Sequence, residues 1–176
     1  LKPHWVQSDA DAHYAHVLDL DIGSLEPLIV APPNPANVHA ISQFEGLEIN
    51  AGYLGSCASG RLEDLRVAAD ILKDRKVKPG FQLNIVPTSQ LIMQQAADEG
   101  ILSTLIKAGA FVSSASCDYC FGHIATMTAG QRAISTGTLN VPGRMGSPDS
   151  EIYLASPASV AAAAVEGRIA DPRHFL

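Results

Sequence analysis

The sequence is poor in several kinds of residue. Its 176 residues include three cysteines, one tryptophan and 6% aromatic side chains, and no apolar run approaches the ~18 residues that span a bilayer. Asp and Glu (18) outnumber Lys and Arg (12), so the net charge of −6 gives no general attraction for nucleic acid. The first residues lack the apolar stretch of a signal peptide. These absences favour a cytoplasmic protein that binds neither membranes nor nucleic acid.

The cysteine count is odd, which fits a secreted disulfide scaffold poorly. A reducing compartment, where thiolates act as ligands or stay free, accommodates it well. A chain of this length buries roughly two-thirds of its unfolded surface in one core, so it needs no disulfide for stability. Because it begins at Leu1 without an initiator Met, we expect a piece of a longer protein. We divide it into an irregular lead, residues 1–14, and a single α/β domain, residues 15–176.

Hydrophobic periodicity predicts a mixture of helices and strands. Apolar residues at i, i+3 and i+4 spacing begin at Leu62 and predict an amphipathic helix of about three turns. Further helices are expected at residues 38–44, 88–100, 101–107 and 156–164. Strands are expected at residues 16–22, 26–33, 47–55, 82–86, 110–113, 132–136 and 152–155. This alternation predicts a three-layer α/β domain with a mainly parallel sheet.

The three cysteines follow two of the expected strands. Cys57 comes after the strand at 47–55, and Cys117 and Cys120 come after the strand at 110–113. Right-handed crossovers align such strands, so both loops fall at the carboxyl edge of the sheet, where open α/β sheets place their sites. The sequence therefore predicts that the three thiols converge.

Spacing alone leaves the chemistry of these thiols open. Soft thiolates suit the iron of an iron–sulfur cluster, and neighbouring Gly and Ser let backbone N–H groups approach its sulfides. A structural zinc site with His123 as fourth ligand, a redox dithiol and a set of unligated cysteines are equally compatible with C-x-x-C spacing. For His123 itself, a place on the surface is the simpler interpretation.

The order of short motifs along the whole chain is more specific. Residues 55–65 read GSCASGRLEDL, residues 143–146 read GRMG and residues 151–157 read EIYLASP. Together with the Cys117-x-x-Cys120 run, they resemble the aconitase superfamily, particularly the large subunits of 3-isopropylmalate dehydratase and homoaconitase. The resemblance covers essentially all of the chain and corresponds to the third α/β domain of such a subunit.

The resemblance implies a [4Fe-4S] cluster held by Cys57, Cys117 and Cys120, with one iron left open as a Lewis acid. It implies a hydro-lyase that dehydrates and rehydrates a 2-hydroxy di- or tricarboxylate, such as 3-isopropylmalate in leucine biosynthesis or homocitrate. It also implies two kinds of partner: preceding domains of the large subunit, and a small swivelling subunit whose serine is the base. We therefore expect this chain alone to be inactive.

The substrate residues also come from the resemblance. Arg144 and Asn140 match the family loop that binds substrate carboxylates, and Ser135 and Thr136 match a Ser-Thr pair beside it. Leu139 stands where the family has a further arginine, so one charge-assisted contact to a carboxylate is missing.

The cysteine loops depart from the family as well. Ala58-Ser59 replaces Thr-Asn after the first cysteine, and Asp118-Tyr119 replaces the usual Gly-Pro between the later two. One interpretation is a related hydro-lyase with altered specificity; the alternative is a non-catalytic or zinc-binding α/β module that keeps the fold. We favour the hydro-lyase because all three cysteines and Arg144 persist.

Overall fold

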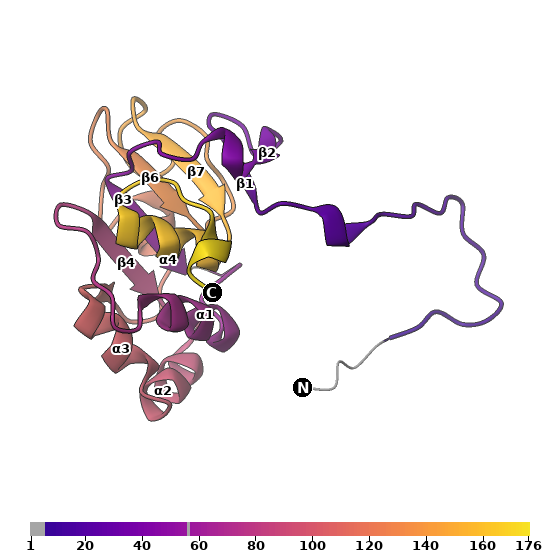
Figure 1. Cartoon of the computed structure of the whole chain (residues 1–176), viewed down its shortest axis with the longest axis horizontal. Helices are drawn as coiled ribbons and strands as arrows, with labels where there is room; N and C mark the ends of the chain where they lie inside the picture. Colours follow the sequence, from indigo (N-terminus) through magenta and orange to yellow (C-terminus); the bar gives the residue numbers. More distant parts are fainter. Residues whose placement is uncertain (1–5, 56) are drawn as a thin grey trace.

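The computed structural model describes residues 6–55 and 57–176, in which seven strands form one sheet (Figure 1). The strand order is β2-β1-β7-β6-β3-β4-β5. The strands are β1 (Leu28–Val30), β2 (Val38–Ala40), β3 (Ala51–Gly55), β4 (Gln82–Val86), β5 (Phe111–Val112), β6 (Arg132–Ser135) and β7 (Glu151–Ala155). Strand β1 is antiparallel to both its neighbours, β2 and β7, and all other pairs are parallel. The predicted mainly parallel sheet is therefore confirmed.

One face of the sheet is covered by helices. They are α1 (Leu62–Leu72), α2 (Gln90–Asp98), α3 (Ile101–Ala108) and α4 (Pro157–Glu166). Helix α1 packs between α4 and α3, and α2 packs on α1 and α3. Aliphatic side chains such as Leu54, Leu65 and Ile134 form the core between these helices and the sheet.

The opposite face is covered by loops instead. Successive strand residues point to opposite faces, so Tyr53 and Ala133 face away from the helices while Leu54 and Ile134 face toward them. Tyr119, Met127 and Met145, which lie in the segments 113–131 and 137–150, pack on that second face. The three layers are thus helices, sheet and loops, which agrees with the predicted layered α/β domain.

Local sequence signals account for the helix boundaries. Ser89 caps α2, its side chain accepting a hydrogen bond from the backbone N of Ile92. Ser156 caps α4 in the same way, Pro157 occupies its first turn, and Gly167 ends it at φ 72°, a left-handed conformation that glycine adopts readily. The predicted helix that begins at Leu62 is confirmed, as are the helices predicted at residues 88–100, 101–107 and 156–164.

Three predicted elements differ. Residues 16–22 form no strand: they belong to an extended arm, residues 6–25, in which Leu18 and Leu20 are 84% and 80% exposed because no neighbouring strand pairs with them (Figure 1). The helix predicted at 38–44 is wrong, since residues 38–40 pair with β1 as β2 and a short 3-10 helix, Ile41–Gln43, follows. The predicted strand 47–55 is regular only from Ala51.

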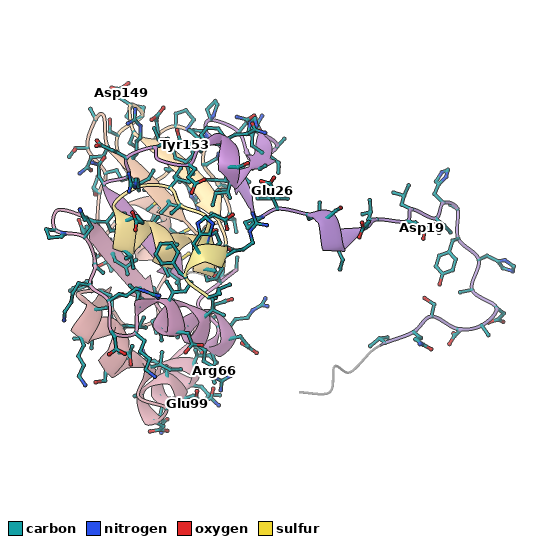
Figure 2. All side chains as sticks on the ribbon, viewed as in Figure 1. Asp19, Glu26, Arg66, Glu99, Asp149 and Tyr153 are labelled. Atoms are coloured by element: carbon teal, nitrogen blue, oxygen red, sulfur yellow. The ribbon has the colours of Figure 1, made fainter. Side chains whose placement is uncertain are left out.

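The arm joins the packed body near Glu26, whose carboxylate accepts a hydrogen bond from Ser42 Oγ at 2.8 Å. Figure 2 shows Asp19 far out on the arm and Glu26 at its base. Residues 1–5 of the predicted lead lie outside the described residues, and the division at residue 14 stays a prediction. No helix in the described ranges is long and apolar enough to cross a membrane.

Candidate functional site

The carboxyl edge of the sheet carries both cysteine segments. Strand β3 ends at Gly55, two residues before Cys57, and β5 ends at Val112, five residues before Cys117. Both strands are parallel neighbours of β4, so they end on the same edge. All three cysteines are free thiols; Cys57 and Cys117 are exposed and Cys120 is 4% exposed.

The Cys57 loop is held close to the sheet by glycines. Gly55 and Gly60 have φ values of 151° and 82°, and a Cβ on either would collide with the carbonyl oxygen of Val86. Thr88 fixes the loop from the neighbouring strand end: its backbone N donates to Gly60 O at 3.0 Å and its hydroxyl donates to Ser59 O at 2.8 Å. Cys57 is therefore presented by a braced turn just before α1.

Cys117 and Cys120 lie on one tight turn. The backbone N of Cys120 donates to Cys117 O at 3.0 Å, and the 3-10 helix Asp118–Phe121 follows. Gly122, at φ 77°, then packs against the backbone of Met145, where no side chain would fit. This close approach connects the turn to the loop that carries Arg144.

Arg144 is the predicted substrate residue that contacts a cysteine. Its Nη2 donates a hydrogen bond to Cys120 Sγ at 3.4 Å. Its Nε is buried and has no hydrogen-bond partner within the described part of the chain. The guanidinium thus contributes positive charge to the cysteine site and retains one unused donor.

The ionisation of the site reflects how close the thiols lie. Burial raises the pKa of Cys117, thiolates at Cys120 and Cys57 raise it further, and the charge of Arg144 lowers it. Burial also raises the pKa of Tyr53, and all three cysteines add to that shift. The charges of Cys57 and Cys120 thus act on the Cys117 thiol, and that of Arg144 opposes them.

Ser135, Thr136 and Asn140 are almost fully buried, and protein groups engage them. Ser135 Oγ accepts from the backbone N of Gly137 at 2.9 Å, and Thr136 Oγ1 joins β6 to β3 by accepting from Gly55 N at 2.9 Å. Asn140 Nδ2 donates to Ala31 O at 2.9 Å. In this structure all three hold the 135–144 loop in place. Whether they also contact substrate stays a prediction.

Leu139, the residue in place of the expected arginine, is 39% exposed on that loop. His123 is also exposed, and its ring lies 4.7 Å from that of Phe121 between centroids. The structure gives His123 an aromatic neighbour, in keeping with the surface position that we considered simpler.

The donor set fits an iron–sulfur cluster in its chemistry. Three free thiols from two loops come to one edge, and a cation contacts the buried one. Among the described residues, no group of three or more His, Cys, Asp or Glu side chains is already arranged to hold a metal ion. Two of the thiols are on the surface and the third is buried.

Two aromatic residues of the site were not identified from sequence. Tyr53 and Tyr119 stack with ring centroids 6.0 Å apart and an interplanar angle of 19°, beside the cysteines. Both border a cavity of about 200 Å³ that is lined with uncharged residues and lies between the sheet and the loops. The alternation of β3 could have placed Tyr53 on the loop face, but nothing in the sequence pairs it with Tyr119.

Comparison with known proteins gives one family and many relatives. Residues 41–167 match the model of the aconitase family (aconitate hydratase). The chain is 47% identical over 175 residues to a 3-isopropylmalate dehydratase large subunit from Hydrogenobaculum sp. (strain Y04AAS1), covering 98% of this chain and 41% of the relative. It is 42% identical over 174 residues to the homoaconitase large subunit of Thermus thermophilus (98% and 42%). The chain thus spans about two-fifths of the length of the curated relatives it matches.

Proposed function

The chain belongs to the aconitase family, and on that premise we propose that it is part of a hydro-lyase acting on a 2-hydroxy di- or tricarboxylate. Its relatives include 3-isopropylmalate dehydratase and homoaconitase large subunits, which support this reaction class and suggest 3-isopropylmalate or homocitrate as substrates. Because the chain spans only two-fifths of those relatives, we propose that further large-subunit domains and a small swivelling subunit with the catalytic base complete the enzyme.

The observation that carries the proposal is that the loops with the three free thiols follow two strands that end on one sheet edge, where Arg144 donates a hydrogen bond to Cys120. We assign Cys57, Cys117 and Cys120 as ligands of a [4Fe-4S] cluster. When bound, a cluster with one iron not held by protein supplies a Lewis acid for a substrate hydroxyl and carboxylate. Three protein ligands suit that function because they leave one position open.

Arg144 is the substrate residue with the strongest support. Its Nη2 is occupied by Cys120 Sγ, whereas its buried Nε has no partner among the described residues. A buried donor without an acceptor costs about 1–3 kcal/mol, and a substrate carboxylate oxygen would remove that cost. We propose that Nε or a neighbouring guanidinium N–H donates to the carboxylate next to the reacting carbon.

Ser135, Thr136 and Asn140 complete the proposed substrate loop. The hydrogen bonds of Thr136 to Gly55 and of Asn140 to Ala31 fix both ends of the segment that leads to Arg144. The exposed Leu139 offers no charge where the family has a further arginine. We therefore propose a substrate with an uncharged group at that position.

The test is reconstitution of the complete protein, with its other domains and small subunit, under anaerobic conditions. Dehydration and hydration are measured on a panel of 2-hydroxy di- and tricarboxylates. Arg144→Met should lower kcat/KM by at least about tenfold, as expected for loss of a charged hydrogen bond. Arg168→Met is the matched control, since Arg168 is exposed and paired with Glu166.

Two outcomes would contradict the proposal. Absence of turnover on every panel member would exclude the hydro-lyase. Stable binding of zinc in place of iron, abolished by His123→Ala as well as by loss of the cysteines, would favour the alternative of a zinc-binding module.

A further inference from the structure

Tyr119 lies between Cys117 and Cys120 and is only 3% exposed, although Cys117, two residues earlier, is on the surface. We propose that Tyr119, stacked on Tyr53, is a positioning residue that holds the Cys117–Cys120 turn at a set distance from Cys57. The inference rests on the proposed function, because the set distance is that of three thiolates on one cluster.

The two rings join the two cysteine-bearing segments directly. Tyr53 is on β3, four residues before Cys57, and Tyr119 is between the two later cysteines. Their centroids are 6.0 Å apart at 19°, within the range of offset aromatic stacking. Moving the turn away from β3 would separate these rings.

A third ring also lies near Tyr119. Phe111 of β5 lies 6.4 Å from Tyr119 between centroids, with the ring planes at 53°. Strand β5 leads into the segment that carries Cys117, and it pairs with β4 next to β3. Tyr119 is therefore in contact with aromatic residues of two strands that end in cysteine loops.

The backbone of the turn supplies little rigidity of its own. The turn is a 3-10 helix of four residues, Asp118–Phe121, with backbone hydrogen bonds from Cys120 N to Cys117 O and from Gly122 N to Tyr119 O, the latter at 3.3 Å. The stacking of Tyr119 on Tyr53 adds a buried aromatic contact to these two backbone hydrogen bonds.

Burial of the two stacked rings strengthens the contact that holds the turn. Tyr53 is 1% exposed, and the same cluster of buried side chains contains Cys120, Met127 and Met145. Aromatic side chains bury large areas, so the ring of Tyr119 is held far more firmly than the exposed thiol of Cys117 could be. Cys120 is then oriented by its neighbour in sequence and by Arg144.

The first experiment uses the metal-free chain, residues 1–176, and a short bis-methanethiosulfonate reagent that links two thiols. Tryptic cleavage after Arg61 and Lys107 puts Cys57 and the later cysteines on different peptides, so linked peptides are counted by mass spectrometry. Tyr119→Ala should slow linking of Cys57 to the turn on the order of tenfold, because the effective concentration of one thiol near the other falls. Tyr119→Phe, which keeps the ring, should stay within about twofold of the parent.

Tyr153→Ala is the matched control for loss of a buried tyrosine ring. Tyr153 is 5% exposed and packs on the helix face against Phe44, away from the cysteines. It should destabilise the fold without changing the linking rate, provided that circular dichroism shows both variants folded at the assay temperature. Equal linking rates in Tyr119→Ala and the parent would overturn the inference, as would an equal loss in Tyr153→Ala.

The second experiment measures iron and sulfide after reconstitution of the complete protein, and then the electron paramagnetic resonance spectrum after one-electron reduction of the cluster with dithionite. Tyr119→Ala should bind less iron and give a broadened spectrum, and Tyr119→Phe should restore both. If the parent binds no cluster while linking depends on Tyr119, the proposed function fails and the positioning role toward the cysteines stands. If Tyr119→Ala binds a cluster like that of the parent, the role toward the cluster is wrong.

Discussion

The two faces of the sheet differ in both covering and content. The helix face is packed mainly with aliphatic side chains, whereas the loop face adds Tyr53, Tyr119, Met127, Met145 and the buried Cys120 to aliphatic residues such as Ile152 and Leu154. The candidate site is on the loop face and at the edge above it. From this comparison we expect the helix layer to contribute most of the stability and the loop layer to carry the proposed site. Substitutions on neighbouring residues of one strand can separate these two contributions.

Leu54 and Tyr53 are adjacent on β3 and point to opposite faces. Leu54→Ala should lower the free energy of unfolding by about 2–5 kcal/mol, because it leaves a cavity in a fully buried core. Urea unfolding measures the loss. The alkylation rate of Cys117 in the folded variant should not change, and a change would mean that the two faces are not separable.

Tyr53→Phe tests the loop face by removing only the tyrosine hydroxyl. The Tyr53 hydroxyl is buried without a hydrogen-bond partner in the described chain. Its removal should therefore raise the free energy of unfolding by about 1 kcal/mol, since the cost of an unsatisfied group disappears. A loss of stability in the same urea experiment would show that the hydroxyl has a partner in solution.

Arg144→Met tests the electrostatics of the site without touching the core. Arg144 lowers the pKa of Cys117, so its loss should raise that pKa and leave less thiolate at a given pH. Alkylation of Cys117 at pH 8 should slow about two- to fivefold, the range for one charge pair near solvent. The pH–rate curve should shift to higher pH; a shift to lower pH would reverse the assigned sign.

The arm provides the smallest expected effect. Leu20→Ser should change the unfolding free energy of this chain by less than about 0.5 kcal/mol, because Leu20 is 80% exposed and the arm extends away from the packed body (Figure 2). A clear loss of stability would indicate that the arm folds onto the body in solution.

The contrast between the faces also explains what could be predicted from sequence. The helices follow from local signals, such as Ser89 and Ser156 as caps and Gly167 as a terminator. The alternation at residues 16–22 is as strand-like as that at 151–155, yet only β7 has neighbouring strands to pair with. A strand needs a partner that local sequence does not specify, which is also why residues 38–40 became β2.

The candidate site also has parts that could be predicted from sequence and parts that could not. The placement of both cysteine loops after strands that end on one edge could be predicted, because parallel strands end on one edge. The contact of Arg144 with Cys120 and the stacking of Tyr119 on Tyr53 could not, since both depend on how irregular loops fold over the sheet. The predicted substrate residues Ser135, Thr136 and Asn140 proved to be engaged by protein groups, which motif spacing does not reveal.

The most direct test of the central claim is the iron and sulfide content of the anaerobically reconstituted complete protein, measured beside Cys57→Ser, Cys117→Ser and Cys120→Ser. If the three thiols form one site, the parent should bind iron and sulfide in equal amounts, with the broad charge-transfer absorbance of a [4Fe-4S] cluster. Each variant should lose that absorbance. Full retention of the cluster in any one of the three variants would contradict the account.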